Sequence, residues 1–504
     1  MHKYIKEEKN MKKLVSLVLA LIMLLSIASI AAADEPASIV IATNFLGNNR
    51  PADLANDFVY QTILDRTGVA VDLVYLDDYD TAINARIIGG DVPDMFMVSP
   101  EQLQTYAAQD LLLPLTQYKE TELKPVFDTY GADTDIPSLY YGDEMYAIPA
   151  AKAISDYYML ILVRKDWNEK YNLTVPTTVD ELYEYCTWLA NNDPDGNGIK
   201  DTIAFTGWGL NGLSAITAPY DVVLGNYVIV RDGKVTNSLL QPRMTEALEM
   251  AKKFYDNGLL DPDMFTANSA VKANVIACNV GVAAMPWSNI LKQAYVEQYK
   301  AVNPEAELTW IDALSDGKGG EPCYATAKHD KYVGDKLVVN ADISEDKLAS
   351  CFKVLQYLCT EEGVNLLYVG LEGRHWTRNE EGKIIGSTDT EIKAEINYTN
   401  MWQFMGRNDA LYLELKFPEA GEATAFGLQM PRYEYFNTSV ILPEDFNVKD
   451  MEDYVNMQMI AFIKGERAIS EYDAFIKELY DSYDFGTYMN ICAEQLVEQK
   501  LANE

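Results

Sequence analysis

Three apolar segments near the start of the chain decide its fold class: SIVIAT at residues 38–43, VAVDLVYL at 69–76 and MFMV at 95–98. Each has the length and apolar content of a strand in a buried sheet. Residues 52–65 and 79–88 separate them, and these two segments are predicted as helices. Strands that alternate with helices pair in parallel, because the helix carries the chain back across the sheet. This part of the chain therefore predicts an α/β fold.

The later part of the chain continues the alternation of strands and helices. Residues 157–163 read YYMLILV and predict a buried strand. Thr178 precedes an apolar-periodic segment, and Glu181 follows three residues later, which is typical of a capping box at a helix start. Residues 345–368 predict one long helical stretch. A chain of 504 residues is too long for one hydrophobic core, since single cores stop growing near ~250–300 residues, so we expect two lobes.

The charge of the chain excludes one class of function. The formal net charge is −35 and the isoelectric point is about 4.4. Such a chain repels phosphate backbones, and no basic stripe offsets the acidity. We therefore expect no binding to nucleic acid.

The N-terminus has the pattern of an export signal. Lys12 and Lys13 precede the apolar run 14–30, and small residues end the segment at Ala31–Ala33. A basic start, an apolar middle and a small-residue end predict a secretory signal peptide over residues 1–33. The alternative is a retained membrane anchor, although the run is shorter than the ~20 residues of a usual span. We expect an exported chain that is periplasmic, held at the cell surface or secreted.

An acidic loop after residue 192 has the spacing of a cation site. Oxygen donors recur at alternate positions of the loop, from Asp193, Asp195, Asn197, the Ile199 carbonyl and Asp201. Gly198 stands where the chain must turn sharply, as in the calcium loop of an EF-hand. The glutamate expected at the twelfth position is replaced by Ala204. We predict a structural calcium site, and the alternative is an acidic turn without an ion.

Catalytic motifs are scarce in the sequence. Beyond the signal segment the histidines are His329 and His375, which lie in unrelated segments, and no G-x-S-x-G motif occurs. No catalytic residue is predicted. The enzymatic alternative is a glycoside hydrolase, because that chemistry needs only two carboxylates and the chain has 76 acidic residues.

Several short motifs, in order and spacing, resemble a known family. They are GGDVPDMF at 89–96, YAAQDLLLPL at 106–115, GDEMYAIP at 142–149, RKDW at 164–167 with VPTT at 175–178, and GLEGRHW at 370–376. Together they resemble the bacterial extracellular solute-binding proteins of the carbohydrate type (family 1), especially the large variety typical of Firmicutes. The resemblance covers nearly the whole chain after the signal segment.

The resemblance implies a two-lobed periplasmic-binding-protein-like fold of type II, whose lobes are joined by crossing hinge strands. Lobe one would comprise residues 37–155 plus 324–372, and lobe two residues 160–320 plus 376–504. The chain would be a monomer that captures a carbohydrate between the lobes and delivers it to the membrane subunits of an ABC importer. A peptide or another small solute is the alternative ligand.

Two details of the resemblance concern particular residues. The family's calcium loop uses a ligand directly after the ninth loop position, which here is Thr202. Many relatives carry a lipid-anchoring cysteine after the signal peptide, whereas this chain has Asp34 after Ala33. We therefore expect no lipid anchor.

A sugar presents apolar ring faces and hydroxyl groups, so a sugar site combines aromatic rings with planar polar side chains. Candidate residues stand in glycine-rich turns, at expected strand ends and at lobe crossings: Trp208, Trp287, Trp376, Trp402, Arg407, Asn44 and Asn48. The alternative for each tryptophan is ordinary packing in a core.

Overall fold

The computed structural model describes residues 36–45, 50–130, 139–148, 159–319, 321–324, 326–328, 335–406, 412, 413, 415, 417, 420–443 and 446–503. The predicted signal peptide lies outside the described residues, and so do Asn48, Arg407 and His329. No helix within the described ranges is long and apolar enough to cross a membrane.

A five-stranded sheet forms the centre of the first body. Its strand order is β2 (Val69–Tyr75), β1 (Ala37–Thr43), β3 (Met95–Val98), β14 (Lys336–Val339) and β6 (Ala147–Ile148). β1 pairs in parallel with both β2 and β3, while β14 runs antiparallel to β3 and β6. The predicted parallel α/β arrangement is confirmed for this segment. A strand from far along the chain, β14, completes the sheet.

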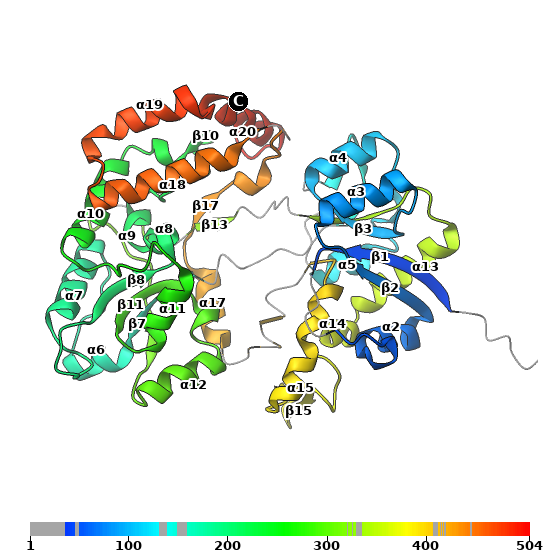
Figure 1. Cartoon of the computed structure of the whole chain (residues 1–504), viewed down its shortest axis with the longest axis horizontal. Helices are drawn as coiled ribbons and strands as arrows, with labels where there is room; N and C mark the ends of the chain where they lie inside the picture. The colour runs from blue at the N-terminus through cyan, green and yellow to red at the C-terminus, as the bar shows by residue number, and fades with distance from the viewer. Residues whose placement is uncertain are drawn as a thin grey trace, which may run out of the picture.

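Helices cover this sheet on both sides (Figure 1). The main ones are α2 (Phe58–Thr67), α3 (Tyr79–Gly89), α4 (Pro100–Ala108), α5 (Lys124–Tyr130) and α13 (Glu345–Leu358). Smaller elements complete the first body: η1 (Leu54–Asn56), η2 (Thr116–Tyr118), β4 (Tyr140–Tyr141), β5 (Glu144–Met145), α14 (Glu361–Tyr368), β15 (Trp376–Arg378), β16 (Ile384–Gly386), α15 (Thr390–Glu395) and η8 (Ile396–Trp402).

The long helix predicted over residues 345–368 is two helices, α13 and α14. The first ends at Leu358, and Thr360 begins the second by accepting a hydrogen bond from the Gly363 backbone N–H at 3.1 Å. A side chain cannot replace the hydrogen of Gly363, because a Cβ there would lie 2.2 Å from the Tyr357 carbonyl oxygen. The capping group and the close approach together break the helix.

A four-stranded sheet forms the centre of the second body. Its strand order is β12 (Leu308–Trp310), β7 (Met159–Arg164), β11 (Val280–Pro286) and β8 (Ile203–Gly207). β11 is parallel to β8 and antiparallel to β7. The capping box at Thr178 is present and begins α7 (Val179–Asn191) as predicted.

Many helices surround this sheet and extend above it (Figure 1). They are α6 (Lys165–Tyr171), α8 (Gly209–Gly212), α9 (Ser214–Thr217), α10 (Met244–Asp256), α11 (Asn268–Ile276), α12 (Gln293–Val302), α17 (Gly421–Gln429), α18 (Val448–Lys464), α19 (Tyr472–Ser482) and α20 (Phe485–Glu498). Short elements complete the body: η5 (Ala218–Tyr220), β9 (Val228–Arg231), β10 (Lys234–Asn237), η6 (Ser238–Leu240), η7 (Trp287–Asn289), β13 (Thr326–Lys328), β17 (Tyr433–Tyr435), η10 (Asn437–Ser439) and η11 (Ile469–Glu471).

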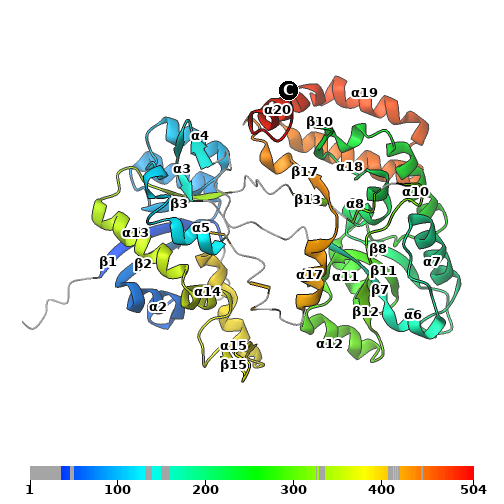
Figure 2. The same cartoon turned by 180° about the vertical axis from the view of Figure 1, so that it is seen from behind.

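Each body has its own large hydrophobic core. Figures 1 and 2 show the bodies side by side, with α17 on the edge of the second body that faces the first. Trp376, Tyr398 and Trp402 pack in the first core, whereas the prediction assigned residues 376–504 to lobe two. After residue 376 the described chain contributes to the second core only from Tyr412 onward, so the predicted start of this segment of lobe two lies too early. The reason is tertiary: Tyr398 donates a hydrogen bond to Asp57 of the first body at 2.8 Å.

Candidate functional site

The first candidate surface lies at the carboxyl edge of the first sheet, where open α/β sheets bind ligands. β1 ends at Thr43 and is followed by Asn44, whose Nδ2 donates to Asp335 Oδ2 at 2.7 Å. The Asn44 Oδ1 atom is enclosed and has no hydrogen-bond partner in the described chain. Phe45 and Tyr75 stand at the same strand ends with 37% and 36% of their surface exposed. Neither ring was among the predicted site residues, and its position directly at a strand end is the one signal for it in the sequence.

The second candidate surface follows strand β8. Trp208 is the first residue after the strand, is half-buried and precedes α8. It lines a cavity of about 390 Å³ together with Gly209, Leu210, Asn211, Leu224, Tyr227, Met264, Phe265, Thr266, Ala267, Asn268, Asn456 and Ile460. The Tyr227 hydroxyl donates to Asn211 Oδ1 at 2.7 Å and orients that amide. The Trp208 Nε1–H is enclosed and has no acceptor in the described chain.

The other three predicted tryptophans are core residues. Trp287 is fully buried in the second core, and Trp402 is fully buried in the first. Trp376 is also buried in the first core, where its Nε1–H donates to the Gly370 carbonyl oxygen at 2.8 Å. Arg50 stacks on the Trp402 ring, with Cζ 5.7 Å from the ring centroid. Rings enclosed in this way offer no face to a solute in this structure, so packing explains them.

A larger cavity, of about 860 Å³, is lined by both bodies. The first body contributes Thr129, Cys359, Glu361, Val364, Asn365, Arg378, Glu381, Gly382, Lys383 and Ile384, and Leu415 packs against its core. The second body contributes Leu413, Gly421, Thr424, Ala425 and Leu428. Arg378 is held by Glu361, at 2.8 Å between Nη2 and Oε1. The lining contains no aromatic ring among the described residues, and its two acidic side chains both come from the first body. The rings that suit a sugar therefore lie at the strand ends rather than in this cavity.

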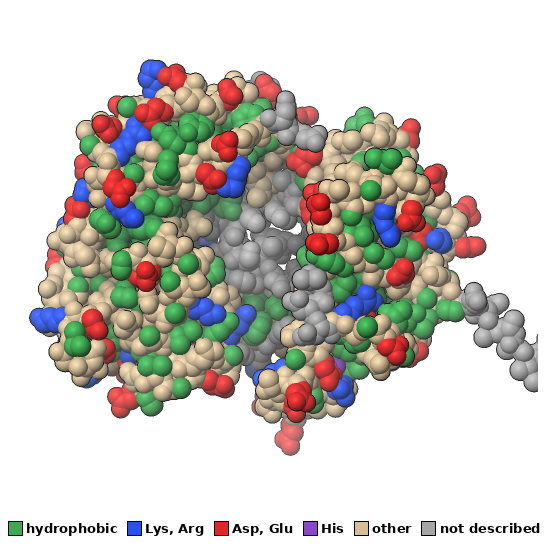
Figure 3. Space-filling view, viewed as in Figure 1, with side chains coloured by type: hydrophobic (Ala, Val, Ile, Leu, Met, Phe, Trp, Pro, Cys, Tyr) green, Lys and Arg blue, Asp and Glu red, His purple; other side chains and the backbone are tan. Residues whose placement is uncertain are grey.

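The carboxyl edge of the first sheet is acidic. Asp335, Asp80 and Glu101 lie near one another, and all three are exposed. Partial enclosure by protein raises the pKa of the Asp335 carboxyl, the Asn44 hydrogen bond opposes this rise, and the charges of Asp80 and Glu101 add to it. Figure 3 shows acidic side chains gathered on the edge of the first body that borders the hollow between the bodies.

The predicted calcium loop forms a tight turn after α7. The Asp193 carboxylate accepts hydrogen bonds from the backbone N–H groups of Gly196, Asn197 and Gly198 at 3.0, 3.1 and 2.8 Å. The Asn197 side-chain amide donates to Asp195 at 3.0 Å and to Asp201 at 3.1 Å. The Asn197 amide thus links the carboxylates of Asp195 and Asp201, which a bound cation would otherwise link.

The loop carboxylates perturb one another. The hydrogen bond with Asp195, followed by the backbone N–H groups, lowers the pKa of Asp193. Partial burial, followed by the nearby Asp193, raises the pKa of Asp195. A divalent cation would relieve this repulsion, so the donors are chemically suited to calcium. Within the described chain, however, no three acidic, histidine or cysteine side chains converge in a metal-binding cluster.

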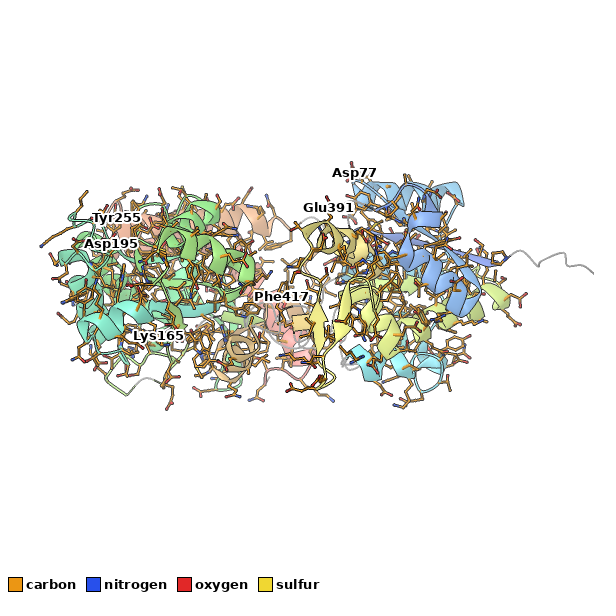
Figure 4. All side chains as sticks on the ribbon, turned by 90° about the horizontal axis from the view of Figure 1, so that it is seen from below. Asp77, Lys165, Asp195, Tyr255, Glu391 and Phe417 are labelled. Atoms are coloured by element: carbon orange, nitrogen blue, oxygen red, sulfur yellow. The ribbon has the colours of Figure 1, made fainter. Side chains whose placement is uncertain are left out.

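Thr202 is the sixth predicted ligand of this loop. It is buried, and its hydroxyl has no hydrogen-bond partner among the described residues. Figure 4 shows Asp195 on the part of the second body that lies away from the first body. A cation in this loop would therefore act on the second body and not on a solute held between the bodies.

Comparison with known proteins places this geometry in a family. A model of the bacterial extracellular solute-binding proteins matches residues 51–365, which is more than half of the chain. The chain belongs to this family. The resemblance stated from the motifs is thereby confirmed.

The curated relatives of this solute-binding protein are distant. YtcQ of Bacillus subtilis (strain 168), named a polygalacturonan/rhamnogalacturonan-binding protein, is 22% identical over 46% of this chain and 46% of its own length. FusA of Streptococcus pneumoniae serotype 4, named a fructooligosaccharide ABC transporter substrate-binding protein, is 25% identical over 43% of each chain. LipO of B. subtilis, named a lipoprotein, is 22% identical over 72% of this chain and 73% of its own. The chain thus spans less than half the length of YtcQ and FusA.

Solved structures share the fold across nearly the whole chain. A human-milk-oligosaccharide (HMO) binding solute-binding protein from Bifidobacterium longum infantis has a TM-score of 0.67 at 16% identity, covering 92% of this chain and 99% of that one. FusA in complex with kestose has a TM-score of 0.62 at 18% identity, with coverages of 92% and 99%. At such low identity the likeness establishes the fold, which is the predicted two-lobed solute-binding architecture.

Proposed function

We propose that this solute-binding protein captures an oligosaccharide between its two bodies and delivers it unaltered to the membrane subunits of an ABC importer. The names of YtcQ and FusA support a carbohydrate, and the name of FusA supports an ABC importer. The chain would act as an exported monomer, with residues 1–33 as its signal peptide. The relative LipO is named a lipoprotein, whereas this chain has Asp34 after Ala33, where a lipid-anchoring cysteine would stand.

One observation carries the proposal. Each body combines an aromatic ring with an amide side chain at the carboxyl end of a parallel strand: Tyr75 with Asn44 in the first, and Trp208 with Asn211 in the second. Rings of this kind stack on the apolar faces of sugars, and amides pair with hydroxyl groups because they both donate and accept. In this proposal a single solute contacts both pairs.

Substitution of Trp208 tests this site. We expect Trp208→Ala to weaken binding of an oligosaccharide such as kestose by about tenfold or more, since a lost stacking contact of ~1.4 kcal/mol corresponds to a tenfold change in Kd. Isothermal titration calorimetry measures the change. Trp188→Ala is the matched control, because Trp188 packs on Tyr171 with ring centroids 5.3 Å apart and lies outside the proposed site.

Three outcomes would contradict the proposal. Equal weakening by both tryptophan variants would show a general effect on folding. Release of shorter sugars during incubation would show a glycoside hydrolase. Binding of peptides, with no binding across a panel of neutral and acidic oligosaccharides, would favour the alternative solute.

We also propose that calcium occupies the loop 193–202 and fixes the exit from α7 into β8. The ligands would be Asp193, Asp195, Asn197, the Ile199 carbonyl, Asp201 and Thr202. The carboxylate repulsion within the loop supports this proposal. Two fold neighbours also support it by name: one is AlgQ2 "without calcium ion" and the other is a FusA "EF-hand mutant".

Chelation tests the calcium proposal. Ligand binding to the folded state stabilises it by ~2.7 kcal/mol at a concentration of 100 times Kd. We therefore expect EDTA to lower the melting temperature by several degrees and added calcium to restore it. Asp193→Asn should abolish the calcium effect, while Asp91→Asn, an exposed carboxylate on the first body, should keep it. A melting temperature that EDTA leaves unchanged would overturn the proposal.

A further inference from the structure

The two strand-end surfaces differ in charge: the Trp208 cavity has an uncharged lining, and the carboxyl edge of the first sheet is acidic. We propose that the solute is an uncharged oligosaccharide and not a uronate, with its sugar rings in the Trp208 cavity and the acidic carboxyl edge of the first sheet excluding carboxylated sugars. This inference rests on the proposed function. The names of the relatives do not decide between neutral and acidic sugars, since YtcQ is named for polymers of acidic sugars and FusA for neutral ones.

The Trp208 cavity has no charged lining residue among those described. Its polar side-chain groups are the amides of Asn211, Asn268 and Asn456, the hydroxyls of Thr266 and Tyr227, and the Nε1–H of Trp208. Amides and hydroxyls match the neutral, mixed donor and acceptor character of sugar hydroxyl groups. A uronate carboxylate would instead require a guanidinium or ammonium group, because a charge that leaves water needs a partner of opposite sign.

One cation lies close to this cavity. Lys464 Nζ is 5.8 Å from the centroid of the Phe265 ring, and Lys464 is not part of the lining. A cation at this position would give the cavity some affinity for an anion, so the experiment includes Lys464.

The carboxyl edge of the first sheet opposes anions. Asp335 lies beside Asn44, and the carboxylates of Asp80 and Glu101 are close enough to affect it. Asp77 and Asp78 follow β2 at the same edge and are exposed. Carboxylates concentrated at the mouth of a binding surface repel a like-charged ligand and lower its local concentration.

The cations near this edge are buried or paired. Lys336 follows Asp335 and is almost fully buried, and burial lowers its pKa to about 8. Arg50 Nε binds Asp57 at 2.9 Å, and its Nη1 donates to the Leu73 carbonyl oxygen at 2.9 Å. Arg50 is therefore already bound within the protein. The buried Lys336 lowers the pKa of Asp335, but the carboxylates of Asp80 and Glu101 act in the opposite direction and the pKa of Asp335 stays raised.

The cavity lined by both bodies adds no excess of positive charge that would attract a uronate. It has two basic side chains, Arg378 and Lys383, and two acidic ones, Glu361 and Glu381. Arg378 is already paired with Glu361 at 2.8 Å. Arg378 Nη1 donates to the Gly382 carbonyl oxygen at 3.2 Å, so both terminal nitrogens that would bind a uronate carboxylate already have partners within the protein.

Calorimetric titration of the full exported chain, residues 34–504, separates the two classes of sugar. The probes are kestose and maltotriose as neutral sugars, and tri-galacturonate and an alginate trimer as acidic ones, at 50 and 300 mM NaCl. We expect a neutral sugar to bind and both uronates to bind at least about a hundredfold more weakly. Because carboxylate repulsion is screened by salt, the uronates should bind less weakly at the higher salt concentration.

Charge variants test the cause. We expect the double substitution Asp80→Asn with Glu101→Gln to raise uronate affinity severalfold and leave neutral binding unchanged. Glu391→Gln with Asp389→Asn, which removes two carboxylates near α15, is the matched control and should change neither. Lys464→Ala should leave neutral binding unchanged, and any residual uronate binding should fall.

The outcomes distinguish this inference from the proposed function. Uronate binding as tight as, or tighter than, neutral binding would overturn the inference and leave the carbohydrate receptor intact. Failure of every sugar to bind, while the chain melts cooperatively, would overturn the proposed function. Equal uronate affinity in the edge variant and its control would show that the carboxyl edge is not the cause.

Discussion

His375 illustrates how a single buried side chain makes stability depend on pH. Its ring is almost fully buried beside Phe58, with ring centroids 4.8 Å apart. Nδ1 accepts the backbone N–H of Leu371 at 2.8 Å, and Nε2 lies 3.1 Å from Glu395 Oε2. Since Nδ1 must accept, the neutral ring with its proton on Nε2 satisfies both contacts, and a second proton would break the Leu371 contact.

The pKa of His375 gives a prediction for the first body. Burial lowers this pKa below 6.5 even though Glu395 opposes the shift. The unfolded chain then binds more protons than the folded chain between the lowered value and 6.5, so stability rises with pH in that window and falls as the pH drops below 6.5. Urea unfolding at several pH values between 5 and 7.5 measures the slope, and we expect His375→Gln to flatten it.

His329→Gln is the control for this measurement, since it removes the other histidine outside the signal segment. The titration of Glu395 does not contribute to the slope measured between pH 5 and 7.5. Arg374 and His375 lower its pKa below 4.5, so its own titration lies below the window. An unchanged slope in His375→Gln would show that other groups cause the pH dependence.

At the scale of elements, a pair of glycines sets where Trp208 lies. Gly207 ends β8 and Gly212 ends α8, and the two backbones touch. A Cβ on Gly207 would lie 2.8 Å from Gly212 Cα and 2.9 Å from the Ala284 carbonyl oxygen. The absence of side chains therefore allows the short helix to fold back on the sheet and places Trp208 at the strand end.

Gly207→Ala tests this packing. We expect a loss of ~1–3 kcal/mol in the free energy of unfolding, as overpacking usually causes, together with weaker sugar binding because the Trp208 turn moves. Chemical denaturation and calorimetric titration measure the two effects. Gly89→Ala is the matched control, because an added Cβ there has no heavy atom within 4 Å, and it should leave both quantities nearly unchanged. Unchanged sugar binding in Gly207→Ala would show that the turn does not position the site.

At the scale of the whole molecule, each of the two bodies has its own hydrophobic core. In the described chain, Tyr412 packs against both cores, and its ring meets those of Tyr368 at 5.5 Å and Phe417 at 5.9 Å between centroids. A contact of this size between two large cores is small compared with the cores themselves. Domains joined in this way are expected to move relative to each other, which suits a receptor that must take up and release a solute.

The sequence determined the local structure of this protein. The strands 38–43, 69–76 and 95–98 and the capping box at Thr178 were predictable because apolar periodicity and helix capping depend on residues a few positions apart. Five short motifs in the right order were enough to indicate the solute-binding family. Trp208 was predictable as a site candidate because glycines surround it.

Tertiary structure alone decided which side chains are exposed. Trp287, Trp376 and Trp402 looked like binding residues but are buried, while Tyr75 and Phe45 looked ordinary and stand exposed at strand ends. A ring has the same local sequence signal whether it packs in a core or faces a cleft. Its burial depends on distant partners, such as those that attach residues 376–405 to the first core, and no local pattern records them.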